Sequence, residues 1–103
     1  MDVNIIRKLN KNAGCSMFLP KPYGLELLFI LSMFDQQNAD SGVDDTFDAI
    51  QYHQPRRAAF SSFIGQLHAY HHITKSVSPL KGSKQILRLS EDTLNGLAKA
   101  LAR

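Results

Sequence analysis

Residues 55–89 read PRRAAFSSFIGQLHAYHHITKSVSPLKGSKQILRL, and this stretch decides the fold. In its first part, residues 55–70, apolar side chains recur at helical spacing, and Pro55 suits the start of a helix because its missing N–H costs no hydrogen bond there. Two segments of partly alternating polarity, 73–77 and 85–89, follow, with proline and glycine between them as turn residues. The stretch therefore predicts a helix and then a β-hairpin with a basic tip. The apolar positions of the helix are Ala59, Phe60, Phe63, Ile64 and Leu67, and its opposite face carries Arg57, Ser61, Ser62, Gly65, Gln66 and Ala69.

Three further helices are expected on either side of this stretch. Residues 24–34 are apolar almost all round, which is typical of a helix at the centre of a core. A short helix is expected over residues 43–50, with Asp44 and Asp45 near the positive end of its dipole. Ser90 is a suitable N-cap for a last helix. The expected buried residues are Val43, Phe47 and Ile50 in the short helix and Leu94, Leu97, Ala98 and Leu101 in the last one.

The N-terminal segment, residues 1–22, is expected to form an arm. Its apolar residues between positions 3 and 9 fit either a strand or one side of a short helix, and Gly14, Pro20 and Pro22 then interrupt regular structure. The arm either packs on the domain or contributes to a dimer. A chain of 103 residues is too short for two cores, so residues 23–103 are expected to form one domain.

The composition excludes several classes of protein. Hydrophobic residues make up 44% and charged residues 20% of the chain, as in an ordinary globular protein and unlike a disordered one. The single cysteine, Cys15, excludes a disulfide scaffold. The longest apolar run, residues 27–31, is too short to cross a bilayer, and the N-terminus lacks the pattern of a signal peptide. We therefore expect a cytoplasmic protein.

Charge is segregated along the chain, although the formal net charge is only +3. Residues 22–55 hold six carboxylates and no lysine or arginine, whereas residues 56–90 hold six lysines and arginines and no carboxylate. A surface built from the second segment is typical of one that faces a polyanion. Chance clustering in a short chain is the alternative interpretation.

The order of elements is that of a helix-turn-helix followed by a wing, because a short helix precedes a longer helix with a small, polar and cationic face, and a hairpin follows. The sequence resembles the winged helix-turn-helix superfamily, and within it the MarR-like transcriptional regulators, over residues 23–95. The resemblance implies a mainly α fold with a small β-hairpin, and a nucleoid-associated, sequence-specific DNA-binding regulator of transcription. The segments that carry it are FIGQL at 63–67, ITKS at 73–76, the turn from Ser78-Pro79 to Gly82-Ser83-Lys84, and QILRLSED at 85–92.

Two surfaces are expected to carry this function. Side chains on the exposed face of helix 55–70 can reach base edges in a major groove, and lysines of the hairpin can reach phosphates. Two-fold pairing doubles the few base contacts that a single winged helix makes, so we expect a repressor that binds double-stranded DNA as a homodimer. The expected DNA contacts are Arg56, Arg57, Ser61, Ser62, Gln66, Lys75, Lys81 and Lys84, and the expected dimer surface is Ile5, Ile6, Leu94, Leu97 and Leu101.

Two other functions remain open at this point. The chain could be a DNA-binding protein of plasmid or phage partition or replication, which sequence alone does not distinguish from a regulator. Winged helices also serve as protein-interaction modules, in which case the basic face would bind an acidic protein.

We expect no enzyme activity, no cofactor and no metal. His68 and His72 have the i, i+4 spacing of zinc ligands, but no carboxylate is near them in the sequence. The chain contains neither a G-x-S-x-G nucleophile motif nor a glycine-rich phosphate loop. Cys15 is interpreted as an ordinary cysteine, with a redox sensor beside two nearby lysines as the alternative.

Overall fold

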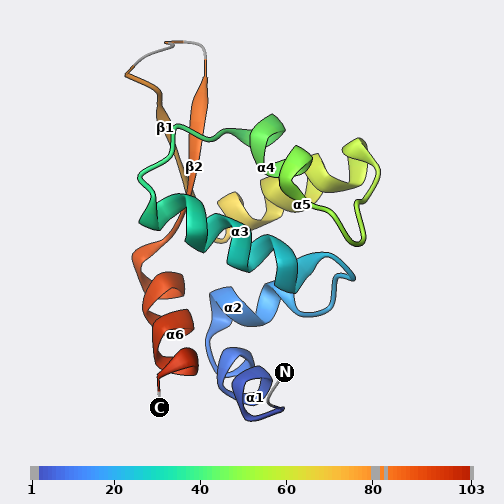
Figure 1. Ribbon diagram of the computed structural model, residues 1–103, viewed down its shortest axis with the longest axis vertical. Coiled ribbons are helices and arrows are strands. Elements are labelled where there is room, and N and C mark those ends of the chain that lie inside the picture. Colours follow the sequence, from blue (N-terminus) through green and yellow to red (C-terminus); the bar gives the residue numbers. More distant parts are fainter. Residues whose placement is uncertain (1–2, 80–81, 83, 103) are drawn as a thin grey trace.

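The computed structural model describes residues 3–79, 82 and 84–102. The protein is mainly helical with one small antiparallel sheet of two strands, which confirms the predicted fold class in this coarse form (Figure 1). No helix in the described part of the chain is long and apolar enough to span a bilayer. The helices are α1 (Val3–Asn10), α2 (Ala13–Phe18), α3 (Gly24–Gln36), α4 (Val43–Ala49), α5 (Arg57–Ala69) and α6 (Glu91–Leu101), and the strands are β1 (Ile73–Val77) and β2 (Gln85–Leu89).

Helix α5 is present as predicted, with a corrected start and one corrected core position. Arg56 is its N-cap in extended backbone, so Pro55 stands just outside the helix. Ala59 is exposed, whereas the sequence predicted it in the core. Each residue turns the helix by about 100°, which places Ala59 on the outer side with Ser62 and Gln66. The buried residues of α5 are Phe60, Phe63, Ile64 and Leu67, as predicted.

Of the three residues predicted to be buried in and after α4, only Ile50 is, and Thr46 is buried in addition. Ile50 at the C-cap of α4 is buried, but Val43 and Phe47 are only half-buried. Thr46 is fully buried, because its hydroxyl donates a hydrogen bond to the Gly42 carbonyl oxygen at 2.8 Å and so needs no water. A buried polar residue therefore replaces part of the predicted apolar stripe.

The N-terminal arm forms two helices that pack against α6. Leu9, Cys15 and Phe18 are fully buried there, so the segment belongs to the core of this chain and the strand alternative is wrong. The packing is close: a Cβ on Gly14 would lie 2.0 Å from Thr93 Oγ1, and one on Gly96 would lie 2.3 Å from the Asn12 side chain. Only glycine, which has no Cβ, fits at these two positions, where the N-terminal segment and α6 come into close contact.

The side of α6 that faces these helices differs from the predicted stripe. Ser90 caps the helix as expected, its hydroxyl accepting a hydrogen bond from the Thr93 N–H. Because α6 packs against α1 and α2, the residues of α6 that face these two helices are the buried ones. Ala98 and Leu101, which the sequence predicted to be buried, are exposed. The buried residues of α6 are Thr93, Leu97 and Ala100.

The hairpin has the predicted strands, paired from Ile73 opposite Leu89 to Val77 opposite Gln85. It follows α5 almost directly. The chain leaves that helix through His71, whose φ of 63° lies in the left-handed region, and the His72 N–H donates to the Leu67 carbonyl oxygen at 2.9 Å. This C-terminal motif turns the chain sharply and fixes the direction of β1 relative to α5.

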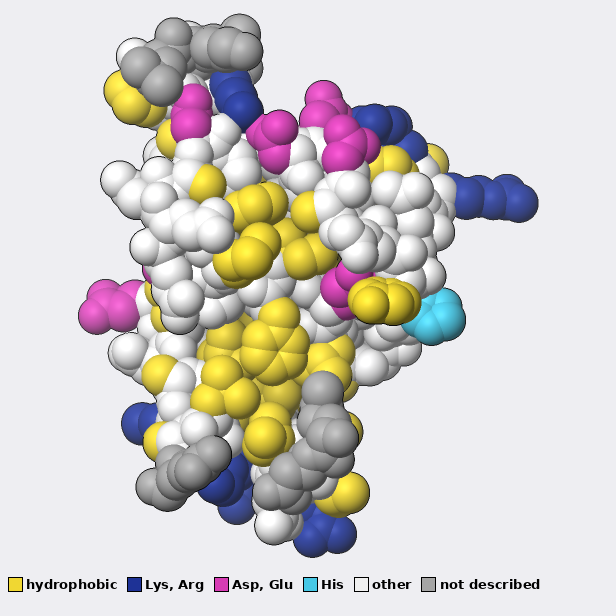
Figure 2. Space-filling view, viewed as in Figure 1, with side chains coloured by type: hydrophobic (Ala, Val, Ile, Leu, Met, Phe, Trp, Pro, Cys, Tyr) yellow, Lys and Arg dark blue, Asp and Glu magenta, His cyan; other side chains and the backbone are white. Residues whose placement is uncertain are grey.

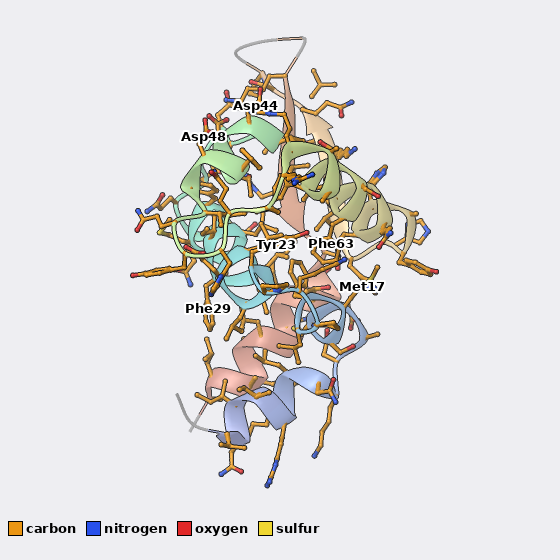
Figure 3. The ribbon with its side chains drawn as sticks, turned by 90° about the vertical axis from the view of Figure 1, so that its right-hand side faces the viewer. Met17, Tyr23, Phe29, Asp44, Asp48 and Phe63 are labelled. Carbon is orange, nitrogen blue, oxygen red and sulfur yellow. The ribbon has the colours of Figure 1, made fainter. Side chains whose placement is uncertain are left out.

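An aromatic cluster joins α5 to the N-terminal half of the chain. The Phe63 ring meets Phe18 and Tyr23 edge to face, with centroid distances of 5.8 Å and 5.9 Å (Figure 3). Phe60 of α5 meets Phe47 of α4 in the same way at 5.2 Å. These contacts hold α5 by its inner face, opposite the exposed side that carries Ser61, Ser62 and Gln66.

Candidate nucleic-acid interface

The outer face of α5 consists of small, polar and cationic side chains. In Figure 3, which is turned by 90° from Figure 1, this helix lies at the upper right. A Cβ placed on Gly65, in the middle of the face, would meet no atom within 4 Å. The helix therefore presents a low surface that another molecule can approach closely. The exposed residues are Arg57, Ala58, Ala59, Ser61, Ser62, Gly65, Gln66, His68 and Ala69, which include every predicted contact on the helix.

Arg57, at the start of α5, is held by α4. Its guanidinium forms an ion pair with the Asp44 carboxylate and lies 4.8 Å from the centroid of the Phe47 ring. The Arg57 side chain is still 57% exposed, so it can exchange Asp44 for another partner while α4 and α5 stay folded. The acidic segment 22–55 and the basic segment 56–90 are separate in the sequence, but the loop between α4 and α5 brings Asp44 of the first beside Arg57 of the second.

Lys84 lies at the loop end of the hairpin, directly before β2, where its carbonyl oxygen accepts the Ser78 N–H at 2.8 Å. Its Nζ is 2.8 Å from Asp45 Oδ2, the same oxygen that accepts the Gly42 N–H at 2.9 Å. The hydrogen bond to Asp45 raises the pKa of Lys84. The lysine is therefore a charged link between the hairpin and the N-terminal end of α4. Lys81, the other predicted cation of the hairpin, lies outside the described residues.

The loop before α4 anchors the hairpin. The Leu87 N–H donates to the Ser41 carbonyl oxygen at 3.0 Å, and the Ser78 hydroxyl donates to Asp40 Oδ2 at 2.8 Å. Arg88 donates to the Ala39 carbonyl oxygen and lies 3.7 Å from the Asp35 carboxylate. Because these bonds join both strands to the end of α3, the hairpin keeps a defined position relative to α5.

Two further predicted cations flank α5. Arg56, its N-cap, is exposed at one end of the helix. Lys75 of β1 is half-buried and lies opposite Leu87 in the sheet. The predicted cations therefore come from three places: Arg56 and Arg57 lie at the start of α5, Lys75 on β1, and Lys84 at the loop end of the hairpin. The acidic neighbours of Arg57 and Lys84 on α4 are the feature that the sequence did not predict.

The alternative chemistries have little support in the structure. Among the residues it describes, no group of three or more His, Cys, Asp or Glu side chains could hold a metal ion. Cys15 is fully buried, its Sγ lies 3.4 Å from the Thr93 carbonyl oxygen, and burial together with Asp92 raises its pKa to about 11. A redox sensor requires an accessible thiol with a lowered pKa, whereas the Cys15 thiol is buried and its pKa is raised.

The residues predicted for a dimer surface are divided between core and surface. Leu97 is buried inside the chain at 2% exposure, so it is not available to a partner. Ile5 and Leu94 are partly buried against the same core. Ile6 and Leu101 are exposed. A surface for a second copy therefore has to be sought beyond the terminal helices alone.

Comparisons with known proteins do not identify this chain. It matches no protein-family model, and no curated protein or solved structure was found to be similar to it.

Proposed function

We propose that the protein is a winged helix-turn-helix regulator of transcription that binds double-stranded DNA in a sequence-specific manner, as a MarR-like repressor would. Helix α5 is the recognition helix and the β1–β2 hairpin is the wing. One observation carries the proposal: the outer face of α5 is low, polar and cationic, and the hairpin is fixed beside it. The chain contributes no carboxylate between Ala49 and Leu89, so α5 and the hairpin add none to this surface.

The chemistry of α5 suits a major groove. Ser61, Ser62 and Gly65 are small enough to let the helix axis come close to the base edges. Gln66 carries an amide that can bond adenine in two places, and Arg57 can do the same with guanine. Base recognition by these side chains supplies the specificity of the proposed regulator.

Phosphate contacts come from the cations around the helix. Arg56 lies at the N-cap of α5 and Lys75 on β1, and Lys84 becomes available when a phosphate replaces the carboxylate of Asp45. Each lysine or arginine that neutralises a phosphate releases a counterion, so binding must weaken steeply with salt. We further propose that the protein acts as a homodimer on a two-fold site, because one recognition helix makes few base contacts.

Fluorescence anisotropy of a labelled random duplex, repeated at several salt concentrations, tests the proposal. We expect binding at low salt and a linear fall of log K with log salt. Lys75→Ala should flatten that slope by about one unit, whereas Lys11→Ala, which removes the same charge from the far α1–α2 end, should leave it unchanged. Equal effects of the two variants would show that α5 is not the DNA surface. No binding even at low salt would overturn the proposal and favour an acidic protein as the partner.

A further inference from the structure

An apolar face lies on α3, away from the basic surface. Figure 2 shows hydrophobic side chains gathered over α3 and continuing down toward α6 and α1. Met33 is 43% exposed and Tyr52 is 78% exposed on this side. Together with Leu25, Phe29 and Ile30 they line a shallow groove of about 390 Å³, called the α3 groove below. A contiguous exposed apolar surface of this kind is typical of a protein–protein contact.

The only titratable carboxylate in the α3 groove is already engaged within the chain. Glu26 accepts the backbone N–H of Gln51 at 2.9 Å and that of Tyr52 at 3.2 Å, one on each carboxylate oxygen. The same contact fixes Tyr52 at the edge of the groove. Both carboxylate oxygens of Glu26 therefore keep a hydrogen bond when the groove is covered, although the carboxylate still carries its charge.

We infer that the α3 groove is the surface on which two copies of this chain pair. A two-fold interface brings each residue near its own copy around the axis, where like charges would repel, so we expect the apolar side chains of the groove, and not Glu26, at the axis. The surroundings are complementary under antiparallel pairing. Above the groove, over α4, lie carboxylates with lysine and arginine side chains among them, and below it, at the α1 end, lie lysines and arginines, so under this pairing the carboxylates of one copy face the cations at the α1 end of the other (Figure 2).

The position of the α3 groove also fits the proposed function, on which this part of the argument rests. The residues that line the groove belong to α3 and to the loop after α4, not to α5 or the hairpin. Pairing through the groove therefore leaves the recognition helix of each copy uncovered. Such a dimer can offer two recognition helices to one duplex.

Sedimentation equilibrium of the full chain, from micromolar to near-millimolar concentration, tests the pairing without DNA. We expect a monomer–dimer equilibrium, weakened about 100-fold by Met33→Glu, because a carboxylate in the centre of a contact must lose its water. The matched control is Val77→Glu, which adds the same charge to a side chain on β1 that is 65% exposed and not in the groove. It should leave the dissociation constant unchanged. Circular dichroism of both variants checks that they fold.

Three results would overturn the pairing surface: a wild-type monomer over the whole range, equal effects of Met33→Glu and Val77→Glu, or a dimer that Leu101→Glu dissociates and Met33→Glu does not. The last result would assign the contact to the terminal helices. A dimer that behaves as expected but binds no duplex at low salt would overturn the proposed function and leave the pairing surface intact.

Discussion

Helices α3 and α5 have the same length and share one core, yet their outer faces have opposite chemistry. Each contains thirteen residues, and each buries aromatic or aliphatic side chains on its inner side. Outward, α5 shows Ser61, Ser62 and Gln66, whereas α3 shows Leu25, Phe29 and Met33. The helical spacing of the buried residues makes both segments helices. The exposed residues alone decide whether the outer surface stays hydrated, as in α5, or favours contact with a partner, as in α3.

The difference decides how each surface can bind. Removal of apolar area from water contributes about 25 cal/mol per Å², without direction and with little dependence on salt, which suits the α3 groove. The α5 face has little apolar area to remove, so its binding has to come from ionic contacts and hydrogen bonds that vary with salt and sequence. Variants of the α3 groove should consequently be detected by measurements of association that depend little on salt, and variants of the α5 face by measurements of binding that depend on salt and on base sequence.

The largest effect should come from the core that supports both faces. Phe63→Ala removes a ring that meets Phe18 and Tyr23 and leaves a cavity between α5 and the N-terminal half. We expect the free energy of unfolding to fall by about 3–5 kcal/mol, measured by urea denaturation. Ser62→Ala, on the exposed side of the same helix, should change it by less than about 0.5 kcal/mol. A small loss for Phe63→Ala would mean that α5 is not anchored through this cluster.

The elements around α5 were predictable, whereas the packing of the ends was not. Strands β1 and β2 have their predicted bounds because polarity alternates and a Pro/Gly turn separates them. The arm was ambiguous because its helices are short, and their stability comes from the crossing with α6 at Gly14 and Gly96, which no local pattern reveals. The same holds for the site. The exposed face of α5 follows from helical spacing, but the pairing of Arg57 with Asp44 depends on how α4 and α5 meet.

A second prediction concerns sequence preference, which only the α5 face should control. Gln66→Ala and Arg57→Ala should each reduce discrimination at the base pairs they contact by about 1–3 kcal/mol. Selected-site sequencing with each variant measures this directly. Met33→Glu, in the α3 groove, should keep the preference within a half-site and lose only the requirement for two half-sites. Unchanged preference in both α5 variants would show that a different face enters the groove.

Cys15 belongs to neither face and provides a reference for the fold itself. Its pKa is raised from 9.0 to about 11 by burial, so above pH 9 the thiol ionises in the unfolded chain before it does so in the folded one. Stability is therefore complete below pH 9 and decreases as the pH rises toward 11, by about 1 kcal/mol near pH 10. Burial also raises the pKa of Tyr23, which adds a loss of stability of the same sign at higher pH. Cys15→Ser should remove the first part of the decrease in denaturation curves and leave that of Tyr23. An unchanged pH dependence would contradict the burial of the thiol.

The smallest effect should come from the carboxylate that competes for the α5 face. In the free protein Arg57 is paired with Asp44, and DNA has to replace that partner while a nearby carboxylate repels its phosphates. Asp44→Asn should therefore tighten duplex binding about three- to tenfold at low salt, and the gain should shrink as salt screens both interactions. The matched control is Asp48→Asn, which removes the same charge from the same helix (Figure 3). Asp48 makes no ion pair within the described part of the chain, so its variant should gain clearly less affinity. Equal gains would mean that only net charge matters, and no gain from Asp44→Asn would mean that Arg57 does not leave α4 when DNA binds.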